Sequence, residues 1–406
     1  MASSLMKKER TRSGLTIVYD PLPTESVTVL VQVKTGSMGD PPKRRGLAHF
    51  IEHMLFEETQ TRSGQQLANA VERLGGELNA ETGHDHTLYY IKIPKSHLDV
   101  AFDILSDIIL HPKFDRATVA KERQVIINEI RMIHDNARFY QFVLFMQTLF
   151  KHHPAQHFIS GTPESVSLIT SADLVRFHAE NYRANNCIVS VVGEAGSVFS
   201  RVKHSFGRLS RGKRVPSFPV RRPFNTFRSV HEERQIAQAY CVLGYKTVPR
   251  TSSESYVFDV LRSHLGRGQS GRLFYEIRAK KGLCYEIGAH NEMNHDFGFF
   301  SVYFSCEPQH VERITRLVRT ELAKTARLSA RALAEAKTYL EGEFLLATEE
   351  TRRRAELRAH FEQSGGAEEM DRYVERIQQV PLDRVKRVAL RTFTNQYTKV
   401  VVGPRA

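Results

Sequence analysis

Cysteine is scarce in this chain. Only four cysteines occur among 406 residues; they are widely spaced, and no two of them form a Cys-x-x-Cys pair. Their spacing therefore gives no sign of a disulfide framework, which in small secreted domains depends on several paired cysteines. We expect reduced, mostly buried thiols, as in cytoplasmic proteins, at Cys187, Cys241, Cys284 and Cys306.

Long apolar runs are also missing. No run reaches the roughly 18 apolar residues that indicate a transmembrane helix, so we expect no membrane association. The first residues of the chain are basic, but no apolar segment of the kind found in a secretory signal follows them. The sequence therefore predicts a cytoplasmic location.

Acidic residues are outnumbered by basic ones, 45 against 58, which gives a net charge of +13. This balance permits binding to nucleic acid, acidic membranes or acidic peptides, and it does not choose among them. No recognised nucleic-acid-binding motif accompanies the charge, so we expect no nucleic-acid partner. Basic clusters such as Arg352-Arg353-Arg354 are expected on solvated helix faces or in linkers.

The two halves of the chain end in a similar way. Residues 172–181 predict a helix and residues 187–192 a strand, followed by Gly193. About 210 residues later, a predicted helix at 382–393 and a strand at 399–402 precede another glycine. This repeated ending indicates two domains of the same architecture.

A proline- and arginine-rich segment at 210–226 separates these halves and predicts a linker. We therefore predict an α+β protein of two tandem, homologous α/β-sandwich domains, in which helices cover a mixed, mostly antiparallel sheet. The N-terminal domain is expected at 1–209 and the C-terminal domain at 227–406.

A candidate metal site lies in a helix predicted at 47–57. His49 and His53 are one helical turn apart, so both imidazoles can reach one ion, and zinc accepts neutral imidazole. Glu52 lies on the same face, where a carboxylate can take a proton from water beside a metal. The order His-x-x-Glu-His is that of the inverzincins. The pattern alone also fits a helix that binds no metal.

A third ligand is needed, and a second predicted helix at 116–134 offers Glu129. The neighbouring Val-Ile-Ile run argues that this glutamate is buried, and a buried carboxylate needs a partner. Glu122 lies seven residues earlier and therefore on the same face. An exposed helix with salt-bridged glutamates remains the alternative.

These residues together resemble the pitrilysin family, the inverzincins that include insulysin and the mitochondrial processing peptidases. The likeness is greatest to the short, processing-peptidase-like bacterial members. In that family a glutamate follows the His-x-x-Glu-His motif at the distance of 76 residues that separates His53 from Glu129 here. The resemblance implies that His49, His53 and Glu129 bind one zinc ion per chain, with Glu52 as the base and Glu122 as a supporting acid.

The flanking sequence carries the same resemblance. It includes Gly46-Leu47-Ala48 before the motif and Asn79-Ala80-x-Thr82 after it. By this likeness Asn79 and Ala80 lie where a peptide substrate adds as a strand. One departure is Glu57-Glu58, where relatives usually have Lys-Gly; we expect it to change the local charge and not the ligands.

The second half contains an element that resembles the arginine and tyrosine pair of the family. Arg278 and Tyr285 are seven residues apart, in the expected context of Gly282-Leu283-Cys284. The resemblance implies that Arg278 holds a carbonyl group of the substrate. It also implies that Tyr285 donates a hydrogen bond to the oxyanion of the tetrahedral intermediate.

The resemblance implies a zinc metalloendopeptidase that hydrolyses short or unfolded peptides. Family members of this length form dimers whose two halves close like a clam shell around a chamber. We expect a homodimer in which each site is completed in trans by the arginine and tyrosine of the other chain. The alternative is a non-catalytic or partner-dependent subunit of a processing-peptidase-like complex.

Two further motifs resemble a dinucleotide-binding loop and a metal site, but neither is interpreted as a binding site. The glycines from Gly266 to Gly271 match Gly-x-Gly-x-x-Gly, but a predicted helix precedes them instead of the strand that a dinucleotide site requires. The cluster Gly83-His84-Asp85-His86 resembles a metal site, but it lies between two predicted strands and is interpreted as a turn.

Overall fold

The computed structural model describes residues 6–220 and 224–405. These residues divide into two compact units that interleave along the chain. Unit one comprises the described residues of Met1–Ile130, His157–Ser217 and Leu346–Asp371, and unit two those of Arg131–Gln156, Phe218–Leu345 and Arg372–Ala406. Each predicted domain is one continuous segment of the chain. Residues 346–371, predicted in the C-terminal domain, belong to unit one, and residues 131–156, predicted in the N-terminal domain, belong to unit two.

The predicted linker at 210–226 is described except for residues 221–223, which lie outside the described residues. Its described part is mostly exposed and contains neither helix nor strand.

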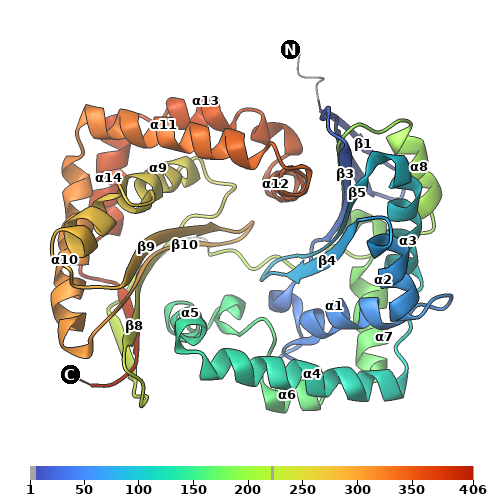
Figure 1. Cartoon of the computed structure of the whole chain (residues 1–406), viewed down its shortest axis with the longest axis horizontal. Helices are drawn as coiled ribbons and strands as arrows, with labels where there is room; N and C mark the ends of the chain where they lie inside the picture. The colour runs from blue at the N-terminus through green and yellow to red at the C-terminus, as the bar shows by residue number, and fades with distance from the viewer. Residues whose placement is uncertain (1–5, 221–223, 406) are drawn as a thin grey trace. The chain divides into compact units, whose positions relative to one another are not determined.

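Unit one is built on a six-stranded sheet in the order β1-β2-β6-β3-β5-β4 (Figure 1). β2 and β6 are parallel, and all other neighbours are antiparallel. The strands are β1 (Lys7–Arg10), β2 (Thr16–Asp20), β3 (Ser26–Val33), β4 (Glu77–Thr82), β5 (Thr87–Pro94) and β6 (Cys187–Val192).

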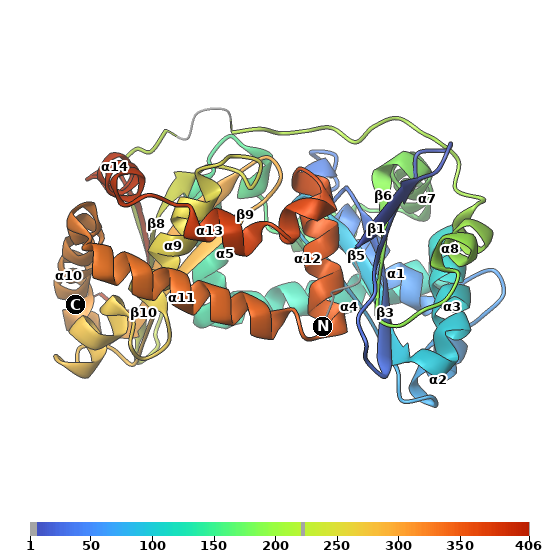
Figure 2. The ribbon, with the colours of Figure 1, turned by 90° about the horizontal axis from the view of Figure 1, so that it is seen from above.

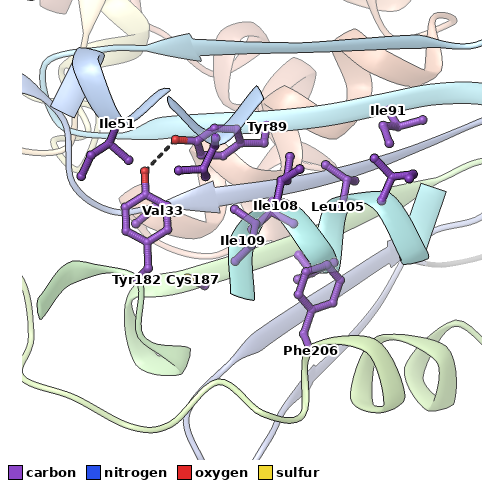
Figure 3. Packing of buried hydrophobic residues seen from close by; sticks show 14 of the residues in the cluster. Val33, Ile51, Tyr89, Ile91, Leu105, Ile108, Ile109, Tyr182, Cys187 and Phe206 are labelled. Atoms are coloured by element: carbon purple, nitrogen blue, oxygen red, sulfur yellow. Dashed lines mark hydrogen bonds between the residues drawn. The ribbon is translucent and has the colours of Figure 1, made fainter. Parts of the chain in front are cut away.

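Side chains of alternate residues in the inner strands β3 and β6 enter two separate cores, which explains why these two strands are mostly apolar. In β3, Val29 and Val31 face the larger core, whereas Leu30 faces the smaller one. Figure 3 shows the larger core, in which the hydroxyl groups of Tyr89 and Tyr182 are hydrogen-bonded at 2.6 Å. The helices of this unit that contribute buried residues to the larger core are α1 (Leu47–Glu57), α2 (Gly64–Glu72), α3 (Leu98–Leu110), α4 (Arg116–Asp135), α6 (Pro163–Ser167), α7 (Ser171–Asn181) and α8 (Val198–Phe206).

The other face of this sheet is covered by α12 (Thr351–Ser364), a helix from the C-terminal half of the chain (Figure 2). Its Ala355 and Ala359 pack in the smaller core. Arg354 and Arg358 both donate to the buried carboxylate of Asp20, with Nε–Oδ2 distances of 2.8 and 2.6 Å. The expectation that the basic cluster at 352–354 lies on a solvated face is therefore wrong for Arg354, because this arginine neutralises a buried charge.

Unit two has a five-stranded sheet in the order β7-β11-β8-β10-β9 (Figure 1). β7 and β11 are parallel and the remaining pairs are antiparallel. The strands are β7 (Arg228–Glu232), β8 (Ala239–Thr247), β9 (Glu286–Met293), β10 (Gly298–Cys306) and β11 (Thr398–Val402). This order repeats β2-β6-β3-β5-β4 of unit one, strand for strand and direction for direction.

Helices also occupy both faces of the second sheet. The helices of unit two are α5 (Ala137–Leu149), α9 (Ser255–Gly266), α10 (Val311–Lys324), α11 (Ala330–Ala347), α13 (Tyr373–Gln378) and α14 (Leu382–Thr392). α5 comes from the N-terminal half of the chain and packs against β8 and β11, as α12 packs on the sheet of unit one. The predicted fold class, two α/β units with mostly antiparallel sheets, is confirmed.

Two predictions about composition can be compared with the described residues. All four cysteines are free and buried, as expected. In the part of the chain that the structure describes, every helix is too short or too polar to span a bilayer.

Candidate metal centre

The metal motif lies on α1, which begins beside a buried carboxylate. Asp40 accepts hydrogen bonds from the backbone N–H groups of Gly46, at 2.7 Å, and Ala48, at 2.9 Å. These N–H groups belong to the start of the helix, where no carbonyl of the preceding turn is available. Burial raises the pKa of Asp40 to about 7. Asp40 thus holds the helix end from which both histidines project.

Gly46 is required at this helix start. Its φ of 90° lies in the left-handed region, and a Cβ atom there would lie 2.4 Å from the carbonyl oxygen of Ser160. Beyond Gly46, buried apolar residues of α1, among them Phe50 and Ile51, pack in the larger core of unit one. The orientation of the helix is therefore fixed by packing on one face and by the Asp40 contacts at its end.

His49, His53 and Glu129 converge. Nε2 of His49 lies 3.6 Å and Nε2 of His53 lies 3.5 Å from Oε2 of Glu129. Two zinc ligands at about 2.1 Å from a tetrahedral ion are about 3.4 Å apart, so this spacing fits zinc. Within 6–220 and 224–405, this is the one group of three or more histidine, cysteine or acidic side chains that lies close enough to hold an ion.

Glu122 lies behind the convergent group. Its Oε2 is 3.4 Å from Nδ1 of His53, and the glutamate is 5% exposed. A carboxylate on the far nitrogen of a histidine ligand fixes the tautomer that presents Nε2 to a metal. His49 has no such support among the described residues, because its buried Nδ1 has no hydrogen-bond partner there.

The pKa shifts of His49 and Glu129 favour the forms that bind a cation, neutral imidazole and carboxylate. Burial lowers the pKa of His49 to about 4, so its imidazole is neutral at pH 7. Burial is the largest single effect on the pKa of His53 and lowers it. The carboxylates around His53, through their charges and above all through the hydrogen bond to Glu129, together outweigh burial and raise this pKa. The same hydrogen bond is the largest cause of the lowered pKa of Glu129. A neutral imidazole, a second imidazole and a carboxylate are a donor set that zinc accepts.

Glu52 extends from α1 toward strand β4. Burial raises the pKa of Glu52, while a hydrogen bond from the hydroxyl of Thr82 acts in the opposite direction. Thr82 belongs to the Asn79-Ala80-x-Thr82 motif, whose resemblance to the family assigns it no role. Local periodicity gives no signal for this contact, because Glu52 and Thr82 lie on different elements and meet only in the folded unit.

Asn79 and Ala80 lie on the edge strand β4. The described residues pair β4 with β5 on one side only. Asn79 is exposed and its Oδ1 accepts from the backbone N–H of Ala80, whereas Ala80 packs against the core. Seven of the predicted site residues are thus in unit one: His49, Glu52, His53, Asn79, Ala80, Glu122 and Glu129.

Arg278 and Tyr285 belong to unit two. Arg278 is exposed on η5 (Phe274–Ala279), a short π-helix, with its guanidinium 4.7 Å from the centre of the Phe274 ring. Tyr285 is 54% exposed, and its backbone N–H donates to Ser305. Both side chains are accessible, as residues that contact a substrate must be.

The two other motifs have the structures expected of them. The glycines at 266–271 follow helix α9, so the strand required before a dinucleotide-binding loop is absent at this described position. Residues 83–86 connect β4 to β5, and His86 contacts the carboxylate of Asp85 at 2.7 Å. The interpretation of this segment as a turn is confirmed.

Sequence comparisons identify close relatives over nearly the whole chain. An uncharacterized zinc protease of Mycobacterium tuberculosis is 32% identical over 400 residues, which cover 96% of this chain and 91% of the relative. One from Rickettsia felis is 30% identical, with coverage of 97% and 96%. Another, YmxG of Bacillus subtilis, is 27% identical and covers 98% of both.

Solved structures have the same fold. A protease from Helicobacter pylori superposes with a TM-score of 0.91 at 25% identity and covers 98% of this chain and 99% of that protein. A Pseudomonas fluorescens structure described as a peptidase M16 inactive domain shares the fold, with a TM-score of 0.89 at 18% identity and coverage of 99% and 98%.

Two family models match consecutive parts of the sequence. The model described as Insulinase (Peptidase family M16) matches residues 16–162, which contain the convergent histidines and glutamates. The model described as Peptidase M16 inactive domain matches residues 168–340. Because both family models match and a relative named as a zinc protease is 32% identical over 96% of the chain, this chain belongs to the M16 (insulinase) peptidase family.

Proposed function

We propose that this protein is a zinc-dependent endopeptidase that hydrolyses short or unfolded peptides. The observation that carries the proposal is the convergence of His49, His53 and Glu129 beside the carboxylate of Glu52. These three side chains would hold one zinc ion per chain. Zinc bound there would polarise the scissile carbonyl and acidify a water molecule near neutral pH.

Each residue of the chain has a separate task in this proposal. Glu52 takes a proton from the attacking water and passes it to the leaving amine. Glu52 is partly buried, so its carboxylate is partly shielded from bulk water, and it accepts a hydrogen bond from the hydroxyl of Thr82. Glu122 holds His53 in the tautomer that leaves Nε2 for the metal.

We further propose that the peptide pairs with the free edge of β4 beside Asn79 and Ala80. Main-chain pairing to an edge strand is largely independent of side-chain sequence, which suits a broad range of peptides. The hydrogen bond between Thr82 and Glu52 supports this site, because it joins the end of β4 to the proposed base.

We propose that two chains form a homodimer that encloses a chamber, with Arg278 and Tyr285 of one chain acting at the metal centre of the other. Family membership and the presence of both elements in one chain support this arrangement. A chamber of this kind would exclude folded proteins. Arg278 would hold a substrate carbonyl and Tyr285 would stabilise the oxyanion.

Activity against a peptide library tests the reaction directly. The wild type and Glu52→Gln are purified with zinc supplied, and zinc content is measured in both. We expect one zinc per chain in each protein and a roughly 100- to 10,000-fold lower activity in the variant, the usual contribution of a positioned acid–base group. Equal activities would refute the proposed role of Glu52.

The alternative of a non-catalytic or partner-dependent subunit has its own outcome. A wild-type protein that binds zinc but cleaves no peptide alone would favour dependence on a partner, and one that binds no zinc would favour the non-catalytic alternative. Mixing Glu52→Gln with Tyr285→Phe tests completion in trans. Recovery of activity above both parents is expected, and no recovery would contradict the proposed homodimer.

A further inference from the structure

We infer that Thr82 is a positioning residue for Glu52, and that it links the proposed peptide-binding strand to the catalytic carboxylate. The inference rests on the proposed peptidase function. Its structural basis is the hydrogen bond that the hydroxyl of Thr82 donates to Oε2 of Glu52.

The location of Thr82 follows from the alternation of strand β4. Leu78, Ala80 and Thr82 are the less exposed residues of the strand, and Glu77, Asn79 and Glu81 are exposed. Thr82 is the last residue of β4 and is 7% exposed, so its hydroxyl is sheltered from water. A sheltered donor competes little with solvent, and a hydrogen bond to a carboxylate is stronger than one between neutral groups.

This contact restricts the carboxylate that has to work beside the metal. Glu52 is on a helix face between two proposed metal ligands, and a glutamate side chain has three rotatable bonds. The hydrogen bond from Thr82 to Oε2 restricts the rotation of the carboxylate, and Oε1 remains to take the proton from water. A displacement of about 1 Å in a catalytic group can reduce a rate roughly 100-fold, so the restraint has catalytic value.

The same strand carries the proposed peptide site. Asn79 and Ala80 are two and three residues from Thr82, within a strand of six residues. Since β4 is paired on one side only in the described structure, a peptide added to its free edge would order the strand to its end. Ordering of that end holds Thr82, and therefore Glu52, in place while substrate is bound.

Removal of the hydroxyl tests the inference. Thr82→Val preserves the shape of the side chain and its preference for strand, and Thr82→Ser keeps the donor. We expect Thr82→Val to lower kcat roughly 10- to 100-fold with KM within about twofold and zinc content unchanged. Thr82→Ser should recover most of kcat.

Thr87 provides a matched control. It is the partner of Thr82 in the β4–β5 pair, is 1% exposed, and donates its hydroxyl to the backbone of Thr35 instead of Glu52. Thr87→Val should keep the wild-type kcat. If Thr82→Val keeps the wild-type kcat as well, or if Thr82→Ser is as slow as Thr82→Val, the positioning role is overturned.

A second measurement does not depend on activity. In metal-free protein, the unfolding equilibria of Thr82→Val, Glu52→Ala and the double variant give the coupling between the two side chains. We expect roughly tenfold coupling in the unfolding equilibrium constant, and additive effects would overturn the contact. An inactive wild type that shows this coupling would refute the proposed function while retaining the contact, so the two failures are distinguishable.

Discussion

Five strands of unit one recur in the same order in unit two, but the helices that follow β3 and β8, the matching strands of the two units, differ. These helices are α1 in unit one and α9 in unit two. In unit one, Glu52 on α1 accepts from Thr82 on the edge strand β4. In unit two, Asp259 on α9 accepts from Asn291 on the edge strand β9, at 2.8 Å. Asp259 also pairs with Arg250, at 2.7 Å. Where unit one offers donors for a metal ion, unit two neutralises its carboxylate with a guanidinium group.

The remaining positions of the two helices confirm this contrast. On α1, His49 and His53 lie three residues before and one residue after Glu52. At the same positions around Asp259, α9 has Tyr256 and Val260. The second unit therefore has no histidine pair on this helix face. The two units share the strand arrangement β2-β6-β3-β5-β4, and only unit one places two histidines beside the carboxylate that accepts from its edge strand.

Removal of a proposed ligand should have the largest effect. His53→Ala is expected to lower the zinc content from one ion per chain to near zero and to abolish peptidase activity, because two remaining ligands hold zinc poorly. His264→Ala on α9 is the control. It should keep the zinc content and the peptidase activity of the wild type, since His264 is outside the convergent group. Loss of zinc from both variants would mean that the metal centre is not confined to unit one.

Loss of one charge should affect the stability of the two units differently. Arg250→Met leaves the carboxylate of Asp259 buried without its cation, which should cost about 3–5 kcal/mol. Glu52→Gln in metal-free protein should be neutral or slightly stabilising at pH 7, because burial raises the pKa of Glu52 and so makes its charge unfavourable. Urea unfolding in the presence of a chelator measures the free energy of unfolding of both variants. Equal losses of this free energy would contradict the proposed difference between the two units.

Removal of the charge of Glu122, which contacts the proposed ligand His53, should have a moderate effect on zinc binding. Glu122→Gln is expected to weaken zinc binding about 10- to 100-fold, since Gln holds His53 without a charge. Glu321→Gln replaces a buried glutamate of unit two that pairs with Arg272, and it should leave zinc affinity unchanged. Competition with a chromogenic chelator measures both affinities. An unchanged affinity in Glu122→Gln would remove Glu122 from the site.

The most gradual effect, spread over several pH units, is a pH dependence at the start of α1. The pKa of Asp40 is raised from 3.8 to about 7 in the folded protein, so the folded state binds a proton more tightly than the unfolded state. Its contribution to stability is fully present below about pH 4 and is lost as the pH rises to about 7. The slope is at most about 1.4 kcal/mol per pH unit.

Asp40→Asn should remove this slope from the unfolding free energy of the metal-free protein. Asp115→Asn, which removes an exposed carboxylate that caps α4, is the control and should keep it. A slope that is the same in Asp40→Asn and in the wild type would show that Asp40 does not titrate in this range.

Much of the candidate metal centre can be predicted from the sequence because the spacing of its residues within each helix is a local feature. The helical period places His49, Glu52 and His53 on one face, and the same period places Glu122 and Glu129 on another. The spacing of 76 residues between His53 and Glu129, which matches the family resemblance, relates the two helices from the sequence alone. The repeated helix–strand–glycine ending predicted the paired architecture in the same way.

The exchange of helices between the two halves could not be predicted from such patterns. α12 is rich in arginine and has little apolar periodicity, so its sequence favours an exposed helix. Only the folded unit shows that Arg354 and Arg358 meet Asp20 beneath it. Contacts between elements that are hundreds of residues apart depend on the packing of the whole unit, and no local period encodes them.

The sequence by itself thus determined which residue types could hold a metal and on which helix faces they lie. The tertiary structure decided that the three donors converge, that Asp40 anchors their helix and that Thr82 restrains Glu52. The physical reason is that helical periodicity acts over a few residues, whereas convergence of side chains from separate elements requires the packed core that brings those elements together.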